Sequence, residues 1–241
     1  MRIAVLFGGK GSRMGEPKWS LEVLGIPLWQ LMRDRFAEIA GEIFMVVPEG
    51  TPELQGVIQV TGGKGYLRDL VLALKLKDPD QEMVIINGDA VLVNPEEVDF
   101  FCELARRSRA SICIPMIPAD FLPEHFRNPR VTNFMPGSMN GVARPQIFYF
   151  SAGFQLSPEC RFSQRLEVHE FLATIGLVGW ENLGRILAFC SNDESWERRW
   201  SQMFSASVDI INCHLSGLAI DVDTSEDMRI AEQILQARQV S

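Results

Sequence analysis

The chain has 241 residues, of which 46% are hydrophobic, and its formal net charge is -8. This acidity argues against nucleic acid as a partner, because proteins that neutralise phosphate backbones carry a basic surface. The five cysteines form no C-x-x-C pair, which argues against a zinc site and favours reduced thiols. No apolar run approaches the roughly 20 residues of a membrane-spanning helix. We therefore expect a cytoplasmic protein with no membrane partner.

Short apolar runs alternate with helical patterns over the first half of the chain. The runs have the length and composition of buried strands, and most of them end at glycine, proline or asparagine. The expected strands are 3–7, 43–47, 57–60, 83–86 and 112–116, and the expected helices are 28–40, 67–76 and 95–107. This alternation predicts an α/β fold with three α/β/α layers around a mostly parallel, Rossmann-like sheet.

The second half of the chain is less regular. Residues 117–145 contain five prolines together with several aromatic residues, which indicates an ordered excursion with a functional role. Further strands are expected at 147–150, 208–212 and 218–222, so this half adds a short mixed sheet, and residues 164–189 predict a helical insertion. Thr224-Ser225-Glu226-Asp227 matches a helix capping pattern, and a terminal helix is expected at 228–238.

The segment after the first strand, Gly8–Lys18, is rich in glycine and in cations. Glycines let the backbone approach an anion closely, and Lys10, Arg13 and Lys18 compensate the charge of a triphosphate. A Walker A loop would need Ser or Thr directly after Gly9-Lys10, and a dinucleotide fingerprint would need glycine in place of Met14. The spacing therefore excludes both of the commoner glycine motifs.

Three aspartates follow apolar runs at predicted strand ends. Asp89 comes directly after Asn87-Gly88. Asp221 and Asp223 stand two residues apart near the end of the expected strand 218–222, so on a strand they would share one face. Open α/β sheets bind ligands at the carboxyl ends of their strands, and Mg2+ takes few protein carboxylates. These aspartates are candidate magnesium ligands, with Asp221 slightly preferred over Asp223.

The glycine-rich segment resembles the signature of the GT-A-like nucleotidyltransferases, which is a strand followed by G-G-x-G-x-R-M, a short spacer and Lys. The stretch Asp221–Asp227 is similar to the family's terminal D-x-D-T-P-E-D motif, with Ser225 where proline is common. Phe7 also departs from the alanine that is typical there. The nearest group is the molybdopterin guanylyl- and cytidylyltransferase-like enzymes. The residues that carry the first match are Gly8, Gly9, Gly11, Arg13, Met14 and Lys18.

The resemblance implies a GT-A nucleotidyltransferase that uses Mg2+ to transfer NMP from an NTP to a phosphorylated small molecule, releasing pyrophosphate. It implies one domain over 1–241, with a nucleotide-binding half (1–116) and an acceptor-binding half (117–241), as a monomer or homodimer. The implied catalytic residues are Arg13, Lys18 and Asp89, and the implied metal ligands are Asp89, Asp221 and Asp223. The implied nucleotide-binding residues are Gly8, Gly9, Lys10, Gly11 and Ser12, with Gly62 and Gly63 as a turn against the base or an ordinary turn. In the second half, Arg144 is a candidate phosphate or carboxylate partner of the acceptor, or a surface cation.

Two other functions are compatible with parts of this pattern. A glycosyltransferase that uses a nucleotide sugar would share the fold and needs a D-x-D metal motif in mid-chain. Asp78-Pro79-Asp80 has the right letters but stands before the fourth strand. A nucleotide-binding regulator without catalysis would have less need of the motif's carboxylates and cations, all of which are present. The sequence does not distinguish between CTP, GTP and other nucleotides.

Overall fold

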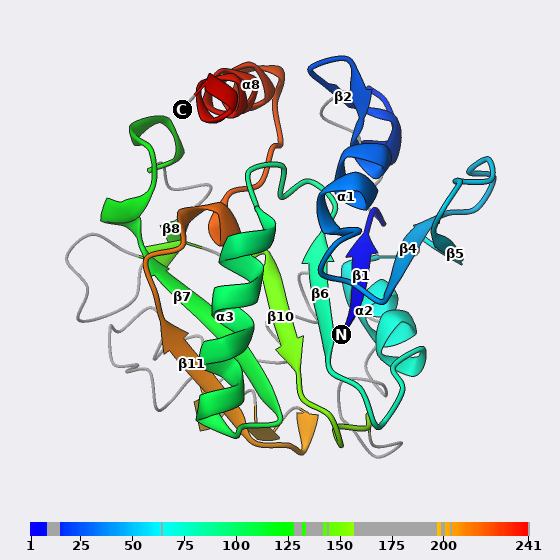
Figure 1. Cartoon of the computed structure of the whole chain (residues 1–241), viewed down its shortest axis with the longest axis vertical. Helices are drawn as coiled ribbons and strands as arrows, with labels where there is room; N and C mark the ends of the chain where they lie inside the picture. The colour runs from blue at the N-terminus through cyan, green and yellow to red at the C-terminus, as the bar shows by residue number, and fades with distance from the viewer. Residues whose placement is uncertain are drawn as a thin grey trace, which may run out of the picture.

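The structure is a computed structural model that describes residues 1–8, 15–63, 65–127, 132–133, 142–143, 145–156, 197–198, 201–202 and 204–240. The helical insertion expected at 164–189 lies outside the described residues, as does the middle of the glycine-rich segment, 9–14. Figure 1 shows the described elements as a central sheet with helices packed against it.

The described strands form one nine-stranded sheet and a separate two-stranded ribbon. The first four strands of the sheet, in the order β5-β4-β1-β6, are parallel, and β10 is antiparallel to its neighbours β6 and β7. β11 then adds to β7 in parallel, and the short pair β9 and β8 extends from the end of β7. The mostly parallel sheet with a mixed second half is confirmed. The strands are β1 (Arg2–Leu6), β4 (Glu42–Pro48), β5 (Ile58–Gly62), β6 (Met83–Asn87), β7 (Ile112–Pro118), β8 (Thr132–Asn133), β9 (Val142–Ala143), β10 (Ile147–Phe150) and β11 (Val208–Asn212), with β2 (Glu22–Val23) and β3 (Ile26–Pro27) in the ribbon.

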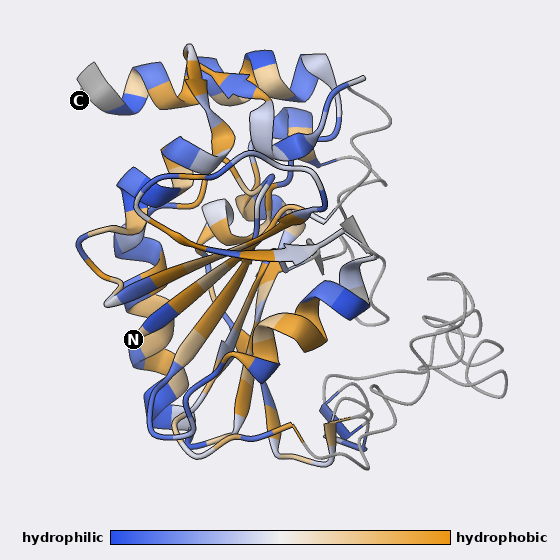
Figure 2. Ribbon diagram, turned by 90° about the vertical axis from the view of Figure 1, so that its right-hand side faces the viewer, coloured by the Kyte–Doolittle hydropathy of each residue, from blue (hydrophilic) through white to orange (hydrophobic). Residues whose placement is uncertain are grey.

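Helices cover both faces of the sheet, because alternate residues of each strand point to opposite sides. Ile3 and Val5 of β1 pack in one buried cluster with α1 (Leu28–Phe36), α3 (Pro95–Ser108) and α8 (Ser225–Val240). Ala4 and Leu6 pack on the other side with α2 (Tyr66–Lys75). Figure 2 shows the strands as an apolar fan between these layers. No helix in the described part of the chain is long and apolar enough to cross a membrane.

Helix ends follow local sequence chemistry. The Asn94 side chain caps α3 by accepting a hydrogen bond of 2.7 Å from the Glu97 N–H, and Pro95 occupies the first helical position. At α8, the Asp227 N–H donates to Thr224 Oγ1 at 3.1 Å and the Thr224 N–H donates to the Asp227 carboxylate at 2.9 Å. The capping pattern read from the sequence is therefore confirmed as a reciprocal capping box.

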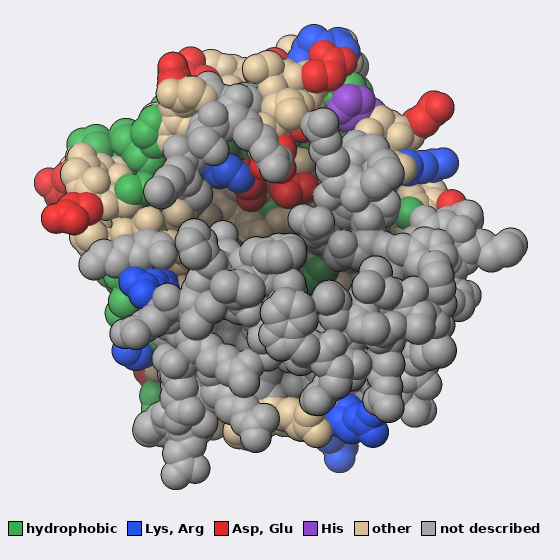
Figure 3. Space-filling view, turned by 180° about the vertical axis from the view of Figure 1, so that it is seen from behind, with side chains coloured by type: hydrophobic (Ala, Val, Ile, Leu, Met, Phe, Trp, Pro, Cys, Tyr) green, Lys and Arg blue, Asp and Glu red, His purple; other side chains and the backbone are tan. Residues whose placement is uncertain are grey.

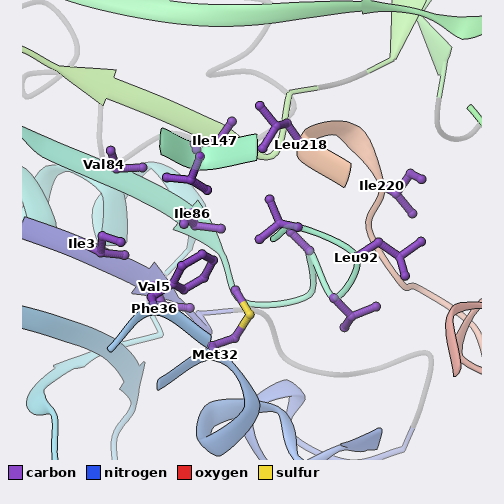
Figure 4. Packing of buried hydrophobic residues seen from close by; sticks show 14 of the residues in the cluster. Ile3, Val5, Met32, Phe36, Val84, Ile86, Leu92, Ile147, Leu218 and Ile220 are labelled. Carbon is purple, nitrogen blue, oxygen red and sulfur yellow. The ribbon is translucent and has the colours of Figure 1, made fainter. Parts of the chain in front are cut away.

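The strand predicted at 218–222 is wrong. Residues Ser216–Ala219 form a short 3-10 helix, η4, and the chain that follows is irregular. Its backbone groups form isolated hydrogen bonds to different neighbours, not the repeated hydrogen bonds that join two strands of a sheet. One of them runs from the Val222 N–H to the Asp89 carbonyl at 3.1 Å. Figure 4 shows Leu218 and Ile220 among the buried residues of the cluster that also holds Leu92, so the apolar run reflects burial of a loop. Helix α1 also ends at Phe36, four residues earlier than predicted.

Candidate active site

The candidate site lies at the carboxyl edge of the parallel strands. β1 ends at Leu6 and leads into the glycine-rich segment, and β6 ends at Asn87, two residues before Asp89. Lys18 opens a short 3-10 helix, η1 (Lys18–Ser20), that returns to the same edge. Ligands of open α/β sheets bind at this edge, so the fold supports the placement made from the sequence.

Lys18 contacts two of the three predicted metal ligands. Its ammonium group forms an ion pair with the Asp89 carboxylate and lies 3.4 Å from Asp223 Oδ1. Burial acts to lower the pKa of Lys18, but the charge and hydrogen bond of Asp89 and the charge of Asp223 raise it above its usual value. Lys18 is therefore held in its charged form, as a group that binds phosphate must be.

Asp89, Asp221 and Asp223 form one carboxylate cluster, in which an oxygen of each lies within 4.8 Å of the others. Seen from behind, acidic side chains and a cationic side chain lie together high on this face (Figure 3). Burial, Asp89 and Asp223 raise the pKa of Asp221 to about 6. Among the described residues, the cluster places three carboxylates beside one ammonium group, that of Lys18, and such an excess of negative charge favours the binding of a divalent cation.

The turn that carries Asp89 packs tightly against the side chain of Phe7. A Cβ on Gly88 would collide with the buried Phe7 ring, so only glycine fits under that ring. The Gly88 N–H also donates to the Leu6 carbonyl at 2.8 Å, which ties the turn to β1. The unusual Phe7 therefore acts through packing, and it helps to fix the position of Asp89.

Two arginines hold the loop that follows Asp89. The half-buried Arg35 of α1 donates from Nη1 to the carbonyl oxygens of Val91 at 2.6 Å and Val93 at 2.8 Å. Arg238 of α8 donates to the Leu92 carbonyl at 2.9 Å. Burial and the nearby Arg238 charge lower the pKa of Arg35 to about 10, which still leaves it charged at neutral pH. Three successive carbonyls of an otherwise apolar loop are thereby satisfied.

A buried aspartate connects the two glycine turns of the site. Asp69, in the first turn of α2, accepts a hydrogen bond of 2.9 Å from the Gly63 N–H and is only 1% exposed. A Cβ on Gly8 would collide with Asp69 Oδ2, and one on Gly62 would lie 2.6 Å from Asp69 Oδ1. Both glycines therefore allow the backbone to approach this carboxylate, and the turn 62–63 and the start of the glycine-rich segment share one neighbour.

A pocket of about 420 Å³ opens next to this arrangement. It lies between the residues that flank Lys18 and the segment at and after the end of β4, and Gly63 contributes to its lining. Gly63 adopts a left-handed φ of +82°, and a Cβ there would lie 2.9 Å from the Pro48 backbone. The pocket is lined by Pro17, Trp19, Pro48, Glu49, Gly50, Thr51 and Gly63.

The carboxylate of Asp227 supports the acidic segment from the start of α8. Its Oδ2 accepts hydrogen bonds from the Asp223 N–H at 3.3 Å and from the Thr224 N–H and Oγ1 at 2.9 and 2.7 Å. Its Oδ1 lies 2.8 Å from His125 Nε2. Burial acts to raise the pKa of Asp227, but the hydrogen bonds from Thr224, His125 and the backbone lower it below its usual value. The carboxylate therefore stays ionised.

The structure brings together four of the predicted site residues, Lys18, Asp89, Asp221 and Asp223. Gly8, Gly62 and Gly63 meet around Asp69. The other predicted residues lie outside the described residues: Gly9, Lys10, Gly11, Ser12, Arg13 and Arg144. Sequence reasoning missed Asp69 and the contact between His125 and Asp227, since neither follows a spacing rule. An aspartate in the first turn of a helix is common without any ligand.

The alternative D-x-D motif lies elsewhere. Asp78 and Asp80 precede β6, which places them at the amino-terminal edge of the sheet. The Asp80 N–H donates to Asp78 Oδ1 at 3.0 Å, as in an ordinary surface turn. This position separates them from the carboxylate cluster.

A glycine turn, a charged lysine and a carboxylate cluster at the carboxyl edge of a mostly parallel sheet are the arrangement expected of a nucleotidyltransferase. The chain belongs to the family of proteins with a MobA-like NTP transferase domain, whose profile matches residues 3–152. This match confirms the resemblance drawn from the glycine-rich segment. No curated protein sequence matches the chain significantly.

Solved structures share the fold over nearly the whole chain. A hypothetical transferase from Thermus thermophilus is 18% identical, with a TM-score of 0.72, and the match covers 95% of this chain and 100% of that one. Molybdopterin-guanine dinucleotide biosynthesis protein A from Archaeoglobus fulgidus is 15% identical, with a TM-score of 0.58 and coverage of 98% and 100%. The 2-C-methyl-D-erythritol 4-phosphate cytidylyltransferase from Thermus thermophilus is 16% identical, with a TM-score of 0.55 and coverage of 97% and 98%. At these identities the likeness establishes the fold.

Proposed function

We propose that the protein transfers a nucleoside monophosphate from an NTP to a phosphorylated small molecule, with Mg2+ as cofactor. A phosphate oxygen of the acceptor attacks the α-phosphorus of the NTP, and the bond from that phosphorus to the bridging oxygen of the β-phosphate breaks. The products are a nucleotide-linked acceptor and pyrophosphate. No protein nucleophile is needed, so the protein contributes positioning and charge stabilisation.

The observation that carries this proposal is the convergence of Lys18 with the three carboxylates beside the glycine turn. A lysine held in its charged form suits the developing charge on the triphosphate. Arg13, from the same glycine-rich segment, is proposed to add a bidentate contact to phosphate oxygens. The site thus pairs phosphate-binding cations with a place for a divalent cation.

The donor set fits Mg2+. Carboxylate oxygens are the ligands this ion prefers, and it keeps several positions for water and phosphate oxygens. Asp89, Asp221 and Asp223 would hold it, and the bound ion would neutralise the triphosphate and orient the α-phosphate. Burial and the carboxylates of Asp89 and Asp223 raise the pKa of Asp221, and a bound ion would relieve the repulsion between these carboxylates.

The two halves of the chain are proposed to divide the substrates within one domain. The nucleoside of the NTP would occupy the pocket between Trp19 and Gly63. The half after residue 116, with Arg144 as a candidate phosphate partner, would bind the acceptor.

The test measures pyrophosphate release with each NTP, Mg2+ and a panel of phosphorylated acceptors. Asp89→Asn, Lys18→Gln and Arg13→Ala should each lower the rate by about 10²-fold or more, the usual effect of losing one transition-state contact. Matched controls are Asp34→Asn on the exposed side of α1 and Lys75→Gln at the exposed end of α2, which should leave the rate unchanged. Absence of release by the wild type, or full activity in Asp89→Asn, contradicts the proposal.

A further inference from the structure

A contact between distant segments ends at the carboxylate cluster. His125 lies in the short 3-10 helix η3 (Glu124–Phe126), within the excursion that follows β7, and Asp227 lies 102 residues away at the start of α8. His125 Nε2 and Asp227 Oδ1 are 2.8 Å apart, and both side chains are largely shielded, with 31% and 15% of their surface exposed. The buried neighbour Phe126 fixes η3 to the core, so the ring has a defined position.

The other oxygen of Asp227 holds the backbone of the acidic segment. It accepts from the N–H groups of Asp223 and Thr224, the residues directly after Val222. Because both oxygens belong to one planar group, the orientation set at Oδ1 by His125 also sets the direction of Oδ2. A carboxylate without the first contact can rotate away from the second, and the Asp223 backbone then loses its fixed position.

We propose that His125 is a positioning residue that, through Asp227, fixes Asp223 as a ligand of the divalent cation. The inference rests on the proposed function for the role of the cation, and it adds His125, a residue outside the family motifs. His125 touches neither the cation nor the substrate. It acts in the same way as the outer-shell partners that orient metal ligands in other proteins.

The experiment compares variants of the full chain by the dissociation constant of Mn2+ alone, measured from the paramagnetic signal of the free ion. His125→Leu removes the ring nitrogen, whereas His125→Gln places an amide nitrogen near the position of Nε2. Glu226→Gln is the matched control, because Glu226 is exposed in the same helical turn and pairs with Arg229 at 2.7 Å. Urea unfolding and hydrogen exchange of the 220–228 segment accompany each variant.

We expect His125→Leu to weaken Mn2+ binding by about tenfold or more, the usual effect of losing an outer-shell partner. Exchange at the Asp223 and Thr224 amides should accelerate, and His125→Gln should recover most of both effects, while Glu226→Gln changes neither. Wild-type affinity in His125→Leu overturns the inference, and so does a His125→Gln variant as weak as His125→Leu. If His125→Leu does not fold, His125→Phe takes its place under the same expectations, because it keeps an aromatic ring but has no nitrogen to bond Asp227.

The outcomes for the proposed function are separate. Wild-type protein that binds Mn2+ but releases no pyrophosphate with any NTP refutes nucleotidyl transfer and leaves the positioning role to be decided by the variants. Wild-type protein that binds no Mn2+ overturns the positioning role as well. An active wild type with an unaffected His125→Leu variant refutes the positioning role alone.

Discussion

Replacing Asp221 by asparagine should stabilise the metal-free protein, and the gain should depend on pH. The pKa of Asp221 rises from 3.8 to about 6 on folding, because of burial and the carboxylates of Asp89 and Asp223. A group with a raised folded pKa favours the folded state below its unfolded pKa, and this contribution is lost as the pH rises through the folded value. At about 1.4 kcal/mol for each pKa unit, the loss amounts to about 3 kcal/mol between pH 3.8 and neutrality.

The assay is urea unfolding of the wild type and Asp221→Asn in EDTA, from about pH 4 to about pH 7.5. The difference in the free energy of unfolding should grow in favour of the variant as the pH rises. Most of the change should fall between about pH 4 and pH 6.5, where Asp221 is ionised in the unfolded chain but still largely protonated in the folded protein. Saturating Mg2+ with NTP should reduce this difference, since the wild type binds the cation more tightly. If the difference in the free energy of unfolding stays constant with pH, then the pKa of Asp221 is not raised by burial and by its neighbouring carboxylates.

Two further substitutions test how the site is supported. Arg35→Met should destabilise the protein by about 2 kcal/mol or more in urea unfolding, because the buried carbonyls of Val91 and Val93 lose a charged donor, and a loss below about 0.5 kcal/mol would contradict this role. Gly217→Ala should cost about 1–3 kcal/mol, because its Cβ would collide with Glu97 Oε2 and lie 2.7 Å from the Leu92 carbonyl oxygen, and a melting temperature equal to that of the wild type would count against the close contact.

Much of the first half of the fold follows from apolar runs and their end signals. The strands β1, β4 and β6 were predicted within about a residue, because buried parallel strands are short, apolar and closed by glycine, proline or asparagine. The capping box of α8 was predicted from Thr224 and Asp227, because its hydrogen bonds are local. Local chemistry is what a single sequence records most directly.

The segment 218–222 shows where such reasoning ends. Its apolar residues are all buried, as those of a central strand would be. Its backbone, however, forms isolated hydrogen bonds to groups on separate loops and pairs with no described strand. Asp221 and Asp223 nonetheless lie near Asp89, as predicted. They do so because the Val222 N–H donates a hydrogen bond to the Asp89 carbonyl and holds the two loops together. The reason given for their common face, a strand, was wrong.

The contacts of Asp69 and His125 could not be predicted from spacing. Asp69 meets Gly8 across the sheet edge, and His125 meets Asp227 from a segment 102 residues away. Both contacts depend on how loops pack after the sheet has formed. The roles of the buried Asp69 carboxylate and of His125 can be inferred only when their neighbours in the folded structure are known.

The most direct test of the central claim follows the fate of the α-phosphate. An NTP labelled at the α-phosphorus is incubated with the protein, Mg2+ and the acceptor that gives the largest pyrophosphate release, and the products are separated. Nucleotidyl transfer predicts that the label moves into the nucleotide-linked acceptor, with one pyrophosphate formed for each label transferred. Label that remains in NDP or NMP, with inorganic phosphate or unlinked pyrophosphate as the other product, would contradict this reaction.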